Sequence, residues 1–166
     1  MNQKRPNLPY RPCVGIVLFN REGRVFLGRR SDLAGKNVWQ CPQGGIDAGE
    51  DPATAAKREL REEIGTDTAQ FMGEHPEWLN YDLPDKLIGV AWGGRFKGQT
   101  QRWFAMRFDA RDRTIDLATH GTPEFDAWRW ADLAELAALD VGFKRPTYQR
   151  LAQDFAPFVA IARGLP

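Results

Sequence analysis

The sequence contains few of the residues that build metal–thiolate sites, disulfide scaffolds or membrane spans. Among its 166 residues are two cysteines and two histidines, and neither cysteine is part of a CxxC motif. We interpret Cys13 and Cys41 as buried thiols in a reducing cytoplasm, with an unsupported disulfide as the alternative. No apolar stretch approaches 18 residues, and the opening MNQKRPNLPYRP lacks the apolar core of a signal peptide. We therefore expect a cytoplasmic protein without a membrane partner.

The chain also lacks a strong excess of either charge. Its formal net charge is +1, with 42% hydrophobic and 27% charged residues, so no global field directs it to nucleic acid or to membrane. Internal repeats and low-complexity segments are missing as well. The length predicts one domain over residues 1–166, and the sequence leaves the oligomeric state open.

Apolar runs and turn residues divide the chain into short strands and helices. The runs CVGIVLF and RVFLGRR, separated by NREG, predict a hairpin over residues 13–30. Residues 74–100, rich in proline, glycine and tryptophan, are predicted to be mostly loop. Further strands are predicted at 38–41, 102–109 and 126–131, and further helices at 132–139 and 145–163, the last broken near Pro157. This order predicts an α+β or mixed α/β fold.

The best-marked helix lies between Asp51 and Gly65. Asp51 is a good N-cap, Pro52 suits the first helical position, and Gly65 suits the position after the last turn. Its end reads RELREEIG, which places three glutamates where the helix dipole prefers cations. Glu59 and Glu63 are also a like-charge i,i+4 pair. Local rules broken in this way indicate a site.

A divalent cation would reverse these electrostatic penalties. At 100° per residue the three glutamates lie along one flank of the helix, beside an apolar stripe that includes Leu60 and Ile64. Oxygen ligands of this kind suit Mg²⁺, whereas a solvated acidic face is the alternative. The preceding Gly44 and Gly45 allow close approach of a ligand to the backbone, or form a plain turn. From these residues alone both interpretations stay open.

Read together, residues 44–66 form the pattern G-x5-E-x7-R-E-L-x-E-E-x-G-T. This resembles the Nudix box, G-x5-E-x7-R-E-U-x-E-E-x-G-U, in which U is aliphatic. Thr66 departs from it at a position usually used for packing. The matching residues are Gly44, Glu50, Arg58, Glu59, Leu60, Glu62, Glu63 and Gly65.

The resemblance implies a hydrolase of nucleoside diphosphates linked to another group, built as an α/β/α sandwich with a mixed sheet. It implies that Glu50 and Arg58 form an orienting pair. It also implies that Mg²⁺ or Mn²⁺, with more than one ion, is bound by the Gly44 carbonyl, Glu59, Glu62 and Glu63. Cations there would neutralise phosphate oxygens and acidify a water.

Segments outside the box resemble the bacterial subgroup of RNA pyrophosphohydrolases and diadenosine tetraphosphate hydrolases. These segments include WQCPQGGI, WLNYDLP, KGQTQRWF, EFDAWRW and FKRPTYQR. The resemblance implies that Glu124 is a metal ligand or general base and that Arg30 contacts phosphate. It implies that Phe143 and Lys144 bind nucleotide, and that Gln99 contacts a base. Without the resemblance Phe143 would be interpreted as a core residue.

Two activities fit these motifs. The first is hydrolysis of the 5′-triphosphate end of RNA to a 5′-monophosphate, with basic residues at 95–107 and 143–150 offering a track for the strand. The second is cleavage of diadenosine tetraphosphate to ATP and AMP. A binding module with vestigial catalysis is disfavoured, since the glutamate set is intact. We expect the first activity.

Overall fold

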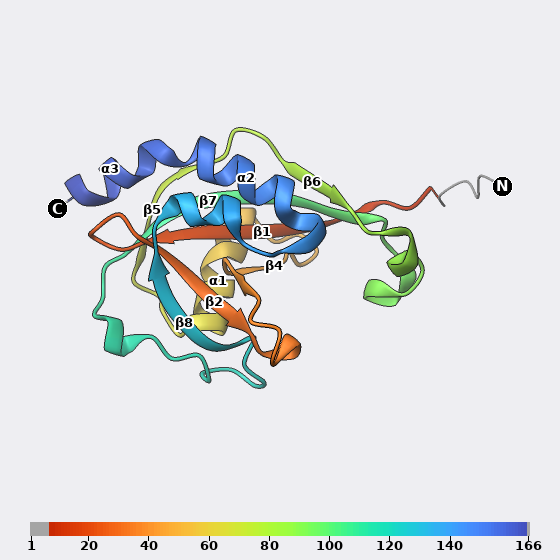
Figure 1. Cartoon of the computed structure of the whole chain (residues 1–166), viewed down its shortest axis with the longest axis horizontal. Coiled ribbons are helices and arrows are strands. Elements are labelled where there is room, and N and C mark those ends of the chain that lie inside the picture. The colour runs from red at the N-terminus through yellow and green to blue at the C-terminus, as the bar shows by residue number, and fades with distance from the viewer. Residues whose placement is uncertain (1–6, 166) are drawn as a thin grey trace.

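The computed structural model describes residues 7–165 and has a mixed β-sheet between two layers of helix (Figure 1). Helix α1 packs on one face, and α2 and α3 pack on the other, so the predicted α+β sandwich is confirmed. The strands are β1 (Tyr10–Phe19), β2 (Val25–Arg30), β3 (Trp39–Gln40), β4 (Gln43–Gly45), β5 (Ala69–Glu74), β6 (Leu79–Asp82), β7 (Gly98–Phe108) and β8 (Phe125–Ala131). The α-helices are α1 (Pro52–Ile64), α2 (Arg145–Asp154) and α3 (Ala156–Gly164).

Strands β1 and β7 form the centre of the sheet. They run parallel, in register from Tyr10 opposite Gly98 to Phe19 opposite Arg107. Helices cover both faces at this point, which explains why β1 is an unbroken apolar run rather than an alternating one. Strands β5 and β6 pair antiparallel with β7, and β3 and β8 pair antiparallel with β2.

The predicted hairpin over residues 13–30 is wrong in its pairing. Strands β1 and β2 pair only at Phe19 and Val25 before they separate. The part of the β1 edge that β2 does not pair with pairs instead with β4, where Val14 lies opposite Gly44. Two adjacent apolar runs predict pairing with each other, and β4, with only three residues, is too short to be recognised in the sequence as a competing strand. The exchange brings Gly44 beside α1.

The prediction of loop over residues 74–100 is wrong in part. Strand β6 lies within this range, and β5 ends and β7 begins inside it. Along β6 the side chains of Leu79 and Tyr81 are buried whereas Asn80 and Asp82 are exposed. An alternation of four residues beside proline and tryptophan is too short to stand out in the sequence.

Helix α1 has the predicted caps. The Asp51 carboxylate accepts the Thr54 N–H at 3.2 Å, and Gly65 ends the helix at φ 72°, in the left-handed region. The helix predicted at 132–139 is wrong in type: Asp132 and Glu135 form a capping box there, but it opens the 3₁₀ turns Leu133–Ala138 rather than an α-helix. The tail forms two helices, separated at Phe155.

The sheet separates two hydrophobic cores. One, beneath α2 and α3, contains Trp103, Tyr148 and Phe155, and the other, beneath α1, contains Phe26 and Leu60. Cys13 and Cys41 are free and buried, so the thiol interpretation is confirmed and the disulfide alternative is wrong. No helix within residues 7–165 is both long and apolar enough to cross a bilayer.

Candidate active site

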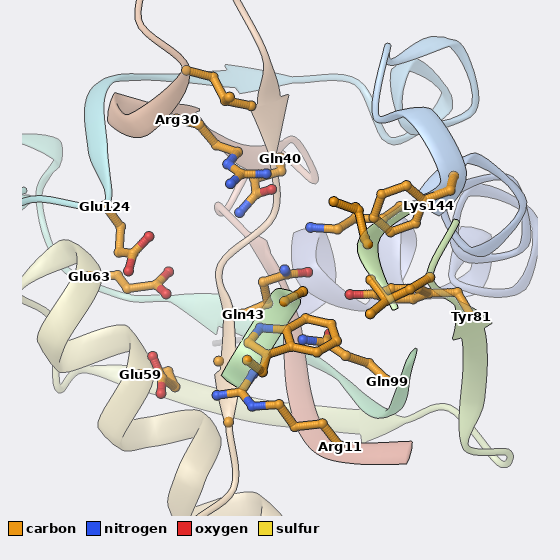
Figure 2. A pocket seen from close by; sticks show the side chains of 18 of the residues that line it. Arg11, Arg30, Gln40, Gln43, Glu59, Glu63, Tyr81, Gln99, Glu124 and Lys144 are labelled. Atoms are coloured by element: carbon orange, nitrogen blue, oxygen red, sulfur yellow. The ribbon is translucent and has the colours of Figure 1, made fainter. Parts of the chain in front are cut away.

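A cavity of about 610 Å³ is lined by residues of β1, β4, α1, β6 and β7 and of the 3₁₀ turn Gly142–Lys144. Figure 2 shows two unlike walls: Glu59, Glu63 and Glu124 lie on one side, and Tyr81 and Lys144 lie on the other. A cavity that combines clustered carboxylates with an aromatic and cationic wall can bind a charged, ring-containing ligand.

The acidic wall holds two buried carboxylates. Glu59 and Glu63 are 8% and 6% exposed, and the Glu63 Oε2 atom has no hydrogen-bond partner among residues 7–165. Burial raises the pKa of Glu63 well above its ordinary value, and the nearby Glu59 and Glu124 raise this pKa further. A cation would remove both penalties, since it would pair with the orphaned oxygen and neutralise the mutual repulsion.

Gly44 lies so close to Glu59 that a larger residue would require the Glu59 carboxylate to move. A Cβ atom there would overlap the Glu59 carboxylate. Strand β4 thus passes directly over this side chain, because it pairs with β1 at Val14. The backbone of Gly44 and the carboxylate of Glu59 thereby face one another without an intervening side chain.

Arg58 ties the loop before α1 to the acidic wall. Its guanidinium donates to both Glu50 oxygens at 2.8 Å and to the Gly45 carbonyl at 2.8 Å. It also donates to Glu59 at 2.9 Å and to Glu62 at 3.2 Å. The hydrogen bonds that Glu50 accepts from Arg58, together with one from the Asp47 backbone N–H, lower the pKa of Glu50 to about 2. The planar guanidinium of Arg58 holds the carboxylates of Glu50, Glu59 and Glu62 in fixed positions, which the single ammonium group of a lysine could not do.

The predicted metal ligands all line this cavity, but they do not form a ready-made metal centre. Among the described residues no group of three or more His, Cys, Asp or Glu side chains has the arrangement of a metal centre. Glu62 forms an ion pair with Arg58 and its side chain is 42% exposed, and Glu124 is exposed just before β8. The donor set still fits a hard divalent cation: oxygen atoms only, one orphaned carboxylate oxygen, and a glycine that leaves room.

The opposite wall carries the predicted nucleotide-binding residues. The ring of Phe143 lies 5.3 Å from that of Tyr81, and Phe143 is 39% exposed, so its interpretation as a core residue is wrong. Burial, reinforced by the charge of Arg30, lowers the pKa of Lys144 to about 8. Arg30 lines the same cavity and holds Asp32 at 2.5 Å. This partly exposed ion pair contributes little to the free energy of folding, so an anionic ligand can compete with Asp32 for Arg30.

Gln99 has its amide orientation set by a chain of hydrogen bonds. The indole N–H of Trp103, which can only donate, donates to Gln101 Oε1 at 3.1 Å. Gln101 Nε2 then donates to Gln99 Oε1 at 3.0 Å. Gln99, buried at the cavity wall, therefore offers its N–H groups rather than its oxygen to a ligand.

The proposed basic track does not follow the sequence run. Arg107 is buried and donates to the carbonyls of Ala162 and Leu165 at the end of α3. Arg102 is paired with Glu74, and Arg150 is paired with Glu77. The cavity instead includes two residues that the sequence did not single out, Arg11 and Trp92. Neither stands in a recognisable spacing pattern.

Comparisons with known proteins agree with this geometry. The NUDIX domain model matches residues 9–151. The chain is 58% identical to an RNA pyrophosphohydrolase of Gluconacetobacter diazotrophicus, over 92% of this chain and 95% of that protein. It is also 58% identical to one of Rhodospirillum rubrum, over 91% and 90%.

Solved structures share the fold at low identity. Escherichia coli dihydroneopterin triphosphate pyrophosphohydrolase superimposes with a TM-score of 0.62 at 22% identity, over 88% of this chain and 99% of that one. A Caenorhabditis elegans Ap4A hydrolase complex superimposes with a TM-score of 0.62 at 18% identity, over 89% and 98%. At these identities the likeness concerns the fold alone.

Proposed function

The chain belongs to the Nudix family, and we propose that it acts there as an RNA pyrophosphohydrolase, which converts the 5′-triphosphate end of RNA to a 5′-monophosphate. The observation that carries the proposal is one cavity with clustered carboxylates on one wall and aromatic and cationic groups on the other. Such a cavity suits a nucleotide whose phosphates point to the acidic wall. The names of relatives at 54–58% identity support the same activity.

The proposed cofactor is Mg²⁺ or Mn²⁺, with more than one ion bound. The residues that would hold it are the Gly44 carbonyl, Glu59, Glu62, Glu63 and Glu124. When bound, divalent ions neutralise the phosphate oxygens and lower the pKa of an attacking water. Glu50 and Arg58 would orient these carboxylates through the hydrogen bonds described above.

The remaining residues would bind the substrate. Arg30 and Lys144 would hold phosphate oxygens, and Phe143 would stack on a base while Gln99 donates to its edge. We assign Glu124 as the acceptor of the proton from the attacking water, because it is exposed to the cavity and forms no hydrogen bond with Arg58. The whole chain would act as one catalytic domain, located in the cytoplasm.

The test compares two substrates. Initial rates with Mg²⁺ on 5′-triphosphorylated RNA and on diadenosine tetraphosphate give kcat/KM for each. We expect the larger kcat/KM on RNA, because relatives so similar along the whole chain are RNA pyrophosphohydrolases. Negligible turnover of RNA beside rapid cleavage of the dinucleotide would overturn the proposal in favour of a dinucleoside polyphosphate hydrolase.

A further inference from the structure

A row of polar side chains runs along one face of β7 from the hydrophobic core to the cavity. It consists of Trp103, Gln101 and Gln99, which alternate along the strand and are 0%, 1% and 4% exposed. Gln99 lines the cavity, whereas Gln101 and Trp103 do not. Burying an amide costs free energy unless the amide is hydrogen-bonded, so the partners of Gln101 show what this buried side chain does.

The row begins at a donor whose position is fixed. A Cβ on Gly15 would overlap the indole of Trp103, and the ring of Tyr148 meets this indole edge-on with ring centres 6.0 Å apart. The indole N–H donates to Gln101 Oε1 at 3.1 Å. Because an indole can donate but not accept, the oxygen of Gln101 faces Trp103 and its NH₂ group faces the cavity side of the row.

The NH₂ group of Gln101 contacts two side chains of the cavity. It donates to Gln99 Oε1 at 3.0 Å and, over a longer distance of 3.5 Å, to Gln43 Oε1. Gln43 belongs to β4, the strand that carries Gly44 past the Glu59 carboxylate. Figure 2 shows the side chains of Gln43 and Gln99 in the cavity. One buried amide therefore joins the cavity residues of two strands.

These contacts decide which atoms of the two cavity amides remain for a ligand. The oxygens of Gln43 and Gln99 accept from Gln101, so their NH₂ groups are the ends left to bind substrate. The cations that line the same cavity are also donors without acceptor atoms: Arg11, Arg30 and Lys144. Amides and cations together favour a ligand that presents hydrogen-bond acceptors, and they disfavour one that presents donors.

We propose that Gln101 is a positioning residue, which never touches the substrate but holds Gln43 and Gln99 as donors and so makes the cavity select hydrogen-bond acceptors. The inference rests on the proposed function and specifies how its site discriminates between ligands. The acceptor is either a phosphate oxygen or an acceptor atom of a nucleoside. Both present lone pairs to the same NH₂ groups, and the experiment below distinguishes them.

A double-mutant cycle tests whether Gln101 acts through the two cavity amides. Gln101→Met keeps the length of the side chain and removes its hydrogen bonds. We expect it to raise KM for 5′-triphosphorylated RNA about fivefold, in the range for one hydrogen bond, with kcat within about twofold of the wild type. In a background with Gln43→Ala and Gln99→Ala, we expect the same substitution to change KM less than about twofold, because its targets are already gone.

Two further variants separate positioning from packing. Trp103→Phe keeps a ring in the core but removes the N–H that orients Gln101, so KM should again rise in the wild-type background and not in the double-alanine background. Gln70→Met makes the same exchange at an exposed position of β5 and should keep the wild-type KM. Rates are measured below the melting temperature of the least stable variant, so that every protein is folded.

Inorganic tripolyphosphate, used as a competitive inhibitor, identifies the acceptor. If Gln101→Met raises its Ki as much as it raises KM for RNA, the amides bind a phosphate oxygen. If KM rises and Ki does not, they bind an atom of the nucleoside.

Two results would overturn the proposal. One is a KM and a Ki that both stay unchanged in folded Gln101→Met, and the other is an equal rise of KM in both backgrounds, which indicates a purely structural role. A wild-type protein that does not hydrolyse RNA would instead contradict the proposed function. The cycle is then run on diadenosine tetraphosphate, where the same two results would overturn the role of Gln101.

Discussion

The backbone of Gly44 lies so close to the Glu59 carboxylate that a single methyl group at Gly44 would overlap it. Strand β4 therefore limits where that carboxylate can sit. We expect Gly44→Ala to displace Glu59 and to lower kcat about a hundredfold, in the range seen when one catalytic contact is lost. Steady-state rates and the melting temperature check this, with Gly164→Ala as a control at a glycine with open space around it. Wild-type kcat in Gly44→Ala would contradict it.

Glu63→Gln should abolish most activity while making the metal-free protein more stable. The pKa of Glu63 is raised, so its ionisation in the folded state opposes folding. This penalty is absent below the ordinary pKa of 4.5, where both states are protonated, and it grows as the pH rises above that value. We expect Glu63→Gln to melt above the wild type at pH 8 in EDTA, and the difference to vanish near pH 4.

The same variant should lose its advantage when Mg²⁺ is added. A bound cation stabilises the folded wild type in proportion to its occupancy, whereas the variant lacks the carboxylate that would bind it. Thermal melts of both proteins with EDTA and with Mg²⁺ test this. An equal Mg²⁺-induced rise in both proteins would show that the ions are bound elsewhere.

Arg58→Lys should impair catalysis although it keeps the charge. Lysine cannot bind both Glu50 oxygens and the Gly45 carbonyl as the guanidinium does. We expect kcat to fall about tenfold or more through misplacement of Glu59. Arg61→Lys, on the exposed face of the same helix, is the matched control and should keep wild-type kcat. Similar rates in the two variants would refute the positioning role.

Lys144 should make substrate binding depend on pH near 8. Its pKa is lowered to about 8, so the ammonium is charged below this pH and neutral above it. We therefore expect KM to increase as the pH rises through 8, because the phosphate loses a cationic partner. In Lys144→Arg the side chain stays charged, and this inflection should be missing. A profile of KM from pH 6 to 10 for both proteins provides the measurement.

Phe143→Ala should mainly raise KM. The ring is 39% exposed at the cavity, so its removal should cost little stability, whereas stacking on a base would be lost. We expect KM to rise about tenfold, within the range for stacking on one base. A large fall in melting temperature with unchanged KM would mean that the ring supports the fold instead.

The acidic helix was predictable because its signals are local. Asp51 and Gly65 cap the helix as expected, and Glu59 and Glu63 lie on the flank that the helical period assigns to them. The pairing of Glu50 with Arg58 followed from the motif, and it is formed at 2.8 Å. All of these depend on residues within a few turns of one another.

Burial and long-range pairing were not predictable in this way. Without the family resemblance the sequence would place Phe143 in the core, and it placed Arg107 on a basic track. The fold instead exposes Phe143 and buries Arg107 under the end of α3. The sequence pattern also joined β1 to β2 along their length, although β4 takes that edge. Burial and strand pairing depend on which distant segments compete for the same sheet edge or the same helix face. The hydrophobicity of neighbouring residues does not show which segment succeeds.

By itself, then, the sequence determined the family and the acidic helix, since caps, helical period and motif spacing are properties of neighbouring residues. Only the tertiary structure decided which residues from distant parts of the chain line the cavity. It set β4 against Glu59, left the Glu63 oxygen unpaired, and brought Trp92 and Arg11 to the wall. These contacts join residues far apart in the chain. They exist because β1 pairs with both β4 and β7, which fixes the positions of these three strands relative to one another.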